Sequence, residues 1–214
     1  SDQNFRSLYD ELTKEEQDLI VGPLEKESLA ALGDMSTLPV PVLGLNYLPR
    51  EVTAPDGLYQ FGLSAEDEAR QIANRLDAEG IDQILVLIPT GNWGDRLETA
   101  LLDQLAENGG IALDIERYFR EDNLRAVTAV EFEPRRRQDA DGIVMVAEPT
   151  VARQFKPLFA FYFGGDLPVY SPSMVYEGNP DPSRDRDLNG VTFTDTPWVL
   201  EKKNRFRDIV KEAM

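Results

Sequence analysis

The strongest constraint on the fold is an unbroken apolar run from Ile84 to Ile88, which has the length of a β-strand. A run without polar alternation is typical of a parallel strand that is buried on both faces of its sheet. The sequence Pro89–Gly94 interrupts this run, and leucines then recur at helical spacing from Asp95 to Asn108. The pattern predicts a strand, a glycine-bearing loop and a helix, and open α/β sheets bind ligands at this end of a strand.

Apolar runs and amphipathic segments alternate along the rest of the chain. Strands are predicted at 18–22, 40–46, 111–115, 142–147, 166–170 and 191–193, with helices at 4–14, 24–32 and 64–80 and others starting near 149 and 206. This alternation predicts an α/β fold with parallel sheets and helices on both faces. The short extended segment 58–62 lies between two such sets, so we expect two lobes with a crossing there.

The charge of the chain excludes two kinds of direct partner. Its 39 acidic residues oppose 22 basic residues, which gives a net charge of −17. Sequence-independent nucleic-acid binding needs a dominant basic surface, and anionic lipid headgroups attract basic segments. We therefore expect no nucleic acid and no anionic membrane surface as a direct partner. Hydrophobic residues make up 42% of the sequence, which is enough for a folded core.

The residue types present also restrict the chemistry. The sequence contains no cysteine and no histidine, which removes thiolate nucleophiles, histidine bases and most zinc sites. The segment Pro89–Gly94 lacks the Lys-Ser/Thr pair of a P-loop, and Ser171 has no histidine with which to form a triad. We expect no catalytic residue, no cofactor and no metal site.

The segment Asp185–Gly190 has two readings. Asp185, Asp187 and Asn189 resemble the start of a calcium loop, but the distal glutamate of such a loop is missing. The alternative is a turn in which Asn189-Gly190 supplies a positive φ angle.

Five polar or aromatic side chains follow predicted strands, at the edge where α/β sheets bind ligands. They are Asn46, Thr90, Trp93, Tyr170 and Ser171. One reading makes them walls of a cleft between the two lobes. The other gives them packing roles, with Trp93 covering the edge of its lobe.

A basic cluster, Arg135, Arg136 and Arg137, stands out on this acidic chain. One reading is a solvated lead-in to the strand at 142–147. The functional reading is an electrostatic contact for an acidic patch on a partner protein.

Several specific sequence motifs are spread over nearly the whole chain. They are Leu19–Leu24, Val42–Asn46, Tyr59–Arg70, Pro89–Arg96, Arg135–Asp141, Leu167–Tyr170, Asp187–Gly190 and Asp195–Leu200. The most specific is Phe-Gly-Leu-Ser-Ala-Glu-Asp-Glu-Ala, at 61–69. Together these motifs resemble the LppC-type outer-membrane lipoproteins.

The resemblance implies a type 1 periplasmic-binding-protein fold with two lobes. Residues 1–61 would form an incomplete first lobe, 62–190 the second lobe, and 191–214 a segment returning toward the first. The family's opening strand–helix pair would precede Ser1, its closing segment would follow Met214, and the stretch Arg120–Glu133 is shorter than the family's.

The resemblance also implies a function without catalysis. The family acts from the periplasmic side of the outer membrane, through a lipid anchor that would lie outside this chain. Its partner is a peptidoglycan synthase, a bifunctional penicillin-binding protein, which it binds and activates. The alternative is a periplasmic small-molecule receptor that binds a solute in the cleft between the lobes.

Overall fold

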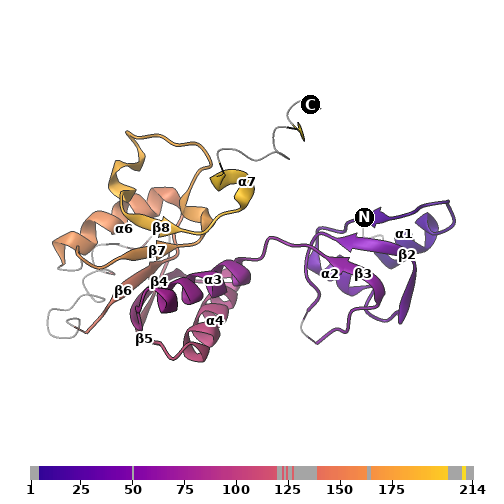
Figure 1. Ribbon diagram of the computed structural model, residues 1–214, viewed down its shortest axis with the longest axis horizontal. Coiled ribbons are helices and arrows are strands. Elements are labelled where there is room, and N and C mark those ends of the chain that lie inside the picture. Colours follow the sequence, from indigo (N-terminus) through magenta and orange to yellow (C-terminus); the bar gives the residue numbers. More distant parts are fainter. Residues whose placement is uncertain are drawn as a thin grey trace. The chain divides into compact units, whose positions relative to one another are not determined.

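A computed structural model describes residues 5–49, 51–119, 122, 124, 127, 139–162, 165–201 and 209–210. The chain forms two compact units, Ser1–Ser64 and Ala65–Met214, and each has its own sheet (Figure 1). Every strand pairing described is parallel, which confirms the predicted α/β class with parallel sheets. The domain boundaries expected from the sequence stay a prediction.

The first unit is a three-stranded sheet with the strand order β1-β2-β3. Its strands are β1 (Ile20–Val21), β2 (Thr37–Gly44) and β3 (Asp56–Gln60), and its helices are α1 (Phe5–Leu12) and α2 (Lys26–Ala30). Alternate residues of β2 are buried, and they pack with residues of both helices in one core. The first residues of the segment 58–62, which was expected to be extended, pair with β2 as part of the third strand.

A tyrosine side chain completes the hydrogen bonding of β2. Val40 lies between Pro39 and Pro41, which have no N–H to donate, and the register of β2 against β3 shifts in this stretch. The hydroxyl of Tyr9, which is fully buried, donates to the carbonyl of Val40 at 2.8 Å and accepts from its N–H at 3.1 Å. One phenol of α1 therefore pairs both backbone groups that would otherwise be left buried and unsatisfied.

The other face of this small sheet carries apolar side chains toward solvent. Val21, Leu43 and Tyr59 are in register across the three strands. Val21 is 61% exposed and Tyr59 65% exposed, whereas the neighbouring residue Val42 is fully buried on the helix-covered face.

The second unit is a five-stranded sheet with the order β5-β4-β6-β7-β8. Its strands are β4 (Gln83–Pro89), β5 (Ile111–Tyr118), β6 (Gly142–Met145), β7 (Val169–Ser171) and β8 (Val191–Phe193). Its α-helices are α3 (Ala65–Ala78), α4 (Asn92–Glu107), α6 (Pro149–Phe161) and α7 (Pro197–Leu200), with 3-10 turns η1 (Ser173–Val175) and η2 (Asp185–Leu188). Strand β4, which lies between β5 and β6, is the predicted apolar run, and all of Ile84–Ile88 is buried.

Two cores cover the two faces of this sheet. Ile84, Val86 and Ile88 pack with α3 and α4, while Leu85 and Leu87 pack with Phe155 and other residues of α6. The strand is apolar throughout because its two sets of side chains face two different cores. Helices therefore lie on both faces, as predicted.

The start of α4 differs from the sequence-based prediction. The helix begins at Asn92, after Gly91 with a φ of 112°, rather than at Asp95. A Cβ on Gly94 would collide with the carbonyl oxygen of Pro89. Because glycine has no side chain, the first turn of α4 can pack directly against the end of β4. Gly94 is therefore needed for this close approach of two backbones and not for a loop conformation.

The strand β8 lies in the second unit. Val191–Phe193, the start of the segment 191–214 that is expected to return toward the first lobe, pairs with Val169–Ser171 in the five-stranded sheet. Apolar contacts explain the placement, because Val191 and Phe193 pack against the α6 core.

Candidate functional site

A cavity of about 500 Å³ opens at the carboxyl edge of the second sheet, where β4 and β5 end. Thr90 and Trp93 both line it, so the structure brings together two of the five residues predicted for a cleft. Its other lining residues are Pro89, Gly91, Asn92, Gly94, Tyr118, Phe119, Glu148, Val151 and Met174. Trp93 also packs against the core beneath α4, in agreement with the packing role considered for it.

Hydrogen bonds hold the wall of this cavity in place. The N–H of Thr90 donates to the carbonyl of Tyr118 at 3.0 Å. The hydroxyl of Tyr118, which is 4% exposed, donates to the carbonyl of Val146 at 2.7 Å. Burial, together with the nearby carboxylate of Glu148, raises the pKa of Tyr118 well above its usual value. Tyr118 therefore stays neutral and acts as a fixed donor that joins the ends of β5 and β6.

Tyr170 and Ser171 have structural partners within the second unit. Ser171 is fully buried and donates to the carbonyl of Met145 at 2.6 Å. Tyr170 is 3% exposed, and its hydroxyl donates to the carboxylate of Glu79 at the end of α3. Burial and this hydrogen bond raise the pKa of Tyr170 to about 12, and the same bond lowers the pKa of Glu79. Tyr170 lines a different cavity, of about 490 Å³, beside α3.

The remaining predicted residues lie elsewhere. Asn46 belongs to the first unit, where its side chain donates to the carbonyl of Leu24 at 2.8 Å and accepts from the N–H of Tyr47 at 2.9 Å. Arg135, Arg136 and Arg137 lie outside the described residues. A cleft between the lobes and a partner contact at these arginines both stay predictions.

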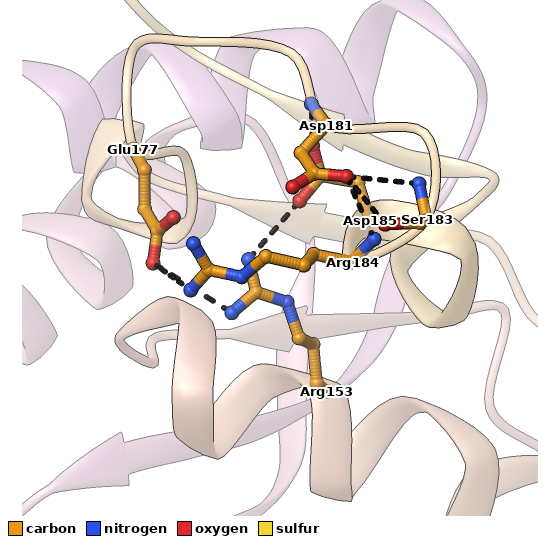
Figure 2. A network of polar contacts seen from close by, with 6 residues as sticks. All are labelled: Arg153, Glu177, Asp181, Ser183, Arg184 and Asp185. Carbon is orange, nitrogen blue, oxygen red and sulfur yellow. Dashed lines mark hydrogen bonds and ion pairs between the residues drawn. The ribbon is translucent and has the colours of Figure 1, made fainter.

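The sequence analysis missed a polar network around Arg153, shown in Figure 2. Arg153 of α6 pairs with Asp185 at 3.0 Å and with Glu177 at 3.6 Å, and Glu177 also pairs with Arg184 at 3.0 Å. Asp185 in addition accepts from the N–H of Asp181 at 2.9 Å. This last bond and the hydrogen bond from Arg153 lower the pKa of Asp185.

The network supports the turn reading of Asp185–Gly190. The carboxylate of Asp185 is occupied by Arg153 and by a backbone N–H, so it serves as an anchor for the segment 177–190. Gly190 has a φ of 83°, as the turn reading requires. In the parts of the chain that are described, no group of three acidic residues is arranged to hold a metal ion.

A second missed residue is Glu68, in the first turn of α3. Its carboxylate accepts from the N–H of Ser173 at 2.6 Å, from the Ser173 hydroxyl at 2.9 Å and from the Thr194 hydroxyl at 2.9 Å. These partners are 105 and 126 residues away in the sequence, so no local pattern could have revealed them.

Parallel α/β units with a cavity at the carboxyl edge of a sheet place this protein in the class with the type 1 periplasmic-binding-protein fold. A type 1 periplasmic binding protein from Bordetella pertussis superimposes with a TM-score of 0.61 and 17% identity, over 99% of this chain and 57% of that one. The sequence then identifies the family. Residues 2–213 match the family described as "LppC putative lipoprotein", and the chain belongs to this family.

Curated relatives carry a common name. The Vibrio antiquarius protein "Penicillin-binding protein activator LpoA" is 26% identical over 92% of this chain and 37% of the relative. The Klebsiella pneumoniae protein of the same name is 28% identical over 85% of this chain and 30% of the relative. The chain thus spans about a third of the length of these relatives.

The same relationship holds among solved structures. The C-domain of Haemophilus influenzae LpoA (YraM), described as a regulator of PBP1A, superimposes with a TM-score of 0.78 and 23% identity. The superposition covers 99% of this chain and 65% of that domain.

Proposed function

We propose that this protein is a non-enzymatic regulator that binds and activates a peptidoglycan synthase of the penicillin-binding-protein class. The observation that carries the proposal is membership of the LppC family over residues 2–213, together with relatives that are named as activators of a penicillin-binding protein. The proposed location is the periplasmic side of the outer membrane, through a lipid anchor outside this chain. None of the helices described is both long enough and apolar enough to span a bilayer.

The chemistry of the described residues supports a binding role over a catalytic one. With no cysteine and no histidine in the sequence, an enzyme would depend on carboxylates, hydroxyls, lysine or tyrosine. Three of the most buried hydroxyls already have structural partners: Tyr9 bonds Val40, Ser171 bonds Met145 and Tyr118 bonds Val146. Buried groups that are hydrogen-bonded in this way make the fold rigid, and a rigid fold presents a fixed surface to a binding partner.

A direct test uses the full-length product of the gene and the purified periplasmic region of a bifunctional penicillin-binding protein from the same cell. We expect a saturable complex in surface plasmon resonance and faster peptide cross-linking in a transpeptidation assay. The heat-unfolded protein is the control and is expected to change neither readout. Absence of both binding and stimulation, with a folded protein and an active synthase, would reject the proposal.

The cavity at Thr90 and Trp93 supports solute binding as a second candidate. A volume of about 500 Å³ is within the range of small-molecule sites, roughly 300–1,000 Å³. The relatives' names favour the activator role, because they describe a protein partner and no solute. A thermal-shift screen of amino acids and short peptides separates the two, since a solute receptor is stabilised by its ligand.

A further inference from the structure

The carboxylate of Glu68 joins three segments of the second unit. Glu68 lies in the first turn of α3, Ser173 begins η1 directly after β7, and Thr194 directly follows β8. One oxygen accepts the N–H of Ser173 and the hydroxyl of Thr194, and the other accepts the hydroxyl of Ser173. We call these four groups the Glu68 clasp.

The Glu68 clasp lies where the polypeptide enters the second unit. The boundary between the two compact units falls between Ser64 and Ala65, so the first turn of α3 is where the polypeptide joins the second unit. The first turn of a helix leaves N–H groups without helical partners, and helix ends fray for this reason. In this protein the first turn of α3 is hydrogen-bonded, through Glu68, to the segments that follow β7 and β8.

The clasp also reaches the two cavities described above. Ser173 is followed by Met174, which lines the cavity at Thr90 and Trp93. Thr194 itself lines the cavity beside α3. Movement of the α3 start relative to the sheet would therefore displace a wall of each cavity.

The strength of the clasp comes from the charge of its acceptor. Hydrogen bonds to an ionised carboxylate are shorter and stronger than neutral ones, and the shortest here is 2.6 Å. Loss of the carboxylate would leave the Ser173 N–H and two hydroxyls without this acceptor at a partly buried site.

We propose that Glu68 is a latch that makes the first turn of α3 one rigid body with the carboxyl ends of β7 and β8. Flexing of the chain between the two units is then confined to residues before Ala65. The exposed apolar residues Phe61 and Leu63, which are 64% and 79% exposed, lie in that stretch. The latch does not depend on the proposed activator function, and it is tested separately, by hydrogen exchange.

Hydrogen exchange tests the latch in the full chain. In Glu68→Ala, amides of 69–72, which bond to the carbonyls of the first turn of α3, and amides of 173–175 and 194–196 should exchange roughly ten- to hundredfold faster, the factor expected for lost hydrogen bonds to a charged group. Glu66→Ala is the matched control: it removes a carboxylate from the same helical turn, where Glu66 pairs with Arg96 at 3.5 Å, outside the clasp. It should leave exchange at 173–175 and 194–196 unchanged.

Three further experiments keep the proposal falsifiable. Glu68→Gln keeps an acceptor oxygen without the charge and should restore most of the protection. Trypsin should cleave at Arg70 in Glu68→Ala but not in the wild type. The pair Ser173→Ala and Thr194→Val should reproduce part of the effect if Glu68→Ala does not fold. Unchanged exchange at 173–175 and 194–196 in Glu68→Ala, or equal acceleration there in Glu66→Ala, overturns the latch.

Discussion

At the scale of single residues, the buried hydroxyl of Tyr9 has an unusual task, since it pairs both backbone groups of Val40. Tyr9→Phe removes only the oxygen atom and leaves that N–H and carbonyl unpaired in the core. We expect a loss of about 1–3 kcal/mol in the free energy of unfolding of the first unit, measured by urea denaturation. The control Tyr59→Phe, at a position that is 65% exposed, should change stability by less than about 0.5 kcal/mol.

Gly94 tests a steric argument rather than a hydrogen bond. Gly94→Ala places a methyl group against the backbone carbonyl of Pro89, which cannot move without breaking the end of β4. Overpacking of this kind costs about 1–3 kcal/mol or more, so the second unit should unfold at lower denaturant concentration. Gly80→Ala is a comparison with open space but a φ of 71°, and should cost only the roughly 1–2 kcal/mol of that backbone conformation. A smaller loss for Gly94→Ala than for Gly80→Ala would contradict the steric account.

Tyr170 predicts a dependence of stability on alkaline pH. Its pKa is raised to about 12 in the folded protein, from the usual tyrosine value of about 10. The neutral phenol is therefore favoured by folding, and its contribution is complete below pH 10 and is lost as the pH rises toward 12. Unfolding free energies measured at pH 9 and pH 11 should differ less in Tyr170→Phe than in the wild type. An equal difference in both proteins would show that Tyr170 does not titrate as described.

At the scale of elements, α6 contains an internal proline. Pro157 is exposed and cannot donate to the carbonyl of Arg153, four residues earlier. Pro157→Ala restores a helical hydrogen bond and removes no buried contact. We expect it to raise the free energy of unfolding, by up to about 3 kcal/mol. Lys156→Ala on the same helix is the control, and a destabilised Pro157→Ala would show that the proline fits its local backbone.

Most strands and helices could be predicted from the sequence because their hydrophobic patterns are local. The run Ile84–Ile88 predicted β4 because burial on both faces leaves no polar position. The start of α4 was misplaced because the sequence alone does not distinguish a glycine in a loop from a glycine at a close contact within a helix. The clasp at Glu68 and the Arg153 network escaped prediction because their partners lie far away in the sequence or on another element.

At the scale of the whole molecule, the two units have separate cores. One hydrophobic cluster lies in the first unit, and two others lie in the second. We therefore expect two unfolding transitions in calorimetry. Tyr9→Phe should lower only one of them and Gly94→Ala only the other. A single transition that moves as a whole with either substitution would show that the two units unfold as one cooperative body.

The wholly parallel pairing of the strands has a consequence for how the chain acquires its fold. Parallel neighbours cannot be joined by a tight turn, so each pairing must wait for a crossover segment to be made and placed. Strand β4 can meet β5 early, but its other neighbour, β6, comes only after the charged stretch that follows β5. Until then one edge of the most apolar strand stays unpaired, which favours slow folding and association with other unfinished chains.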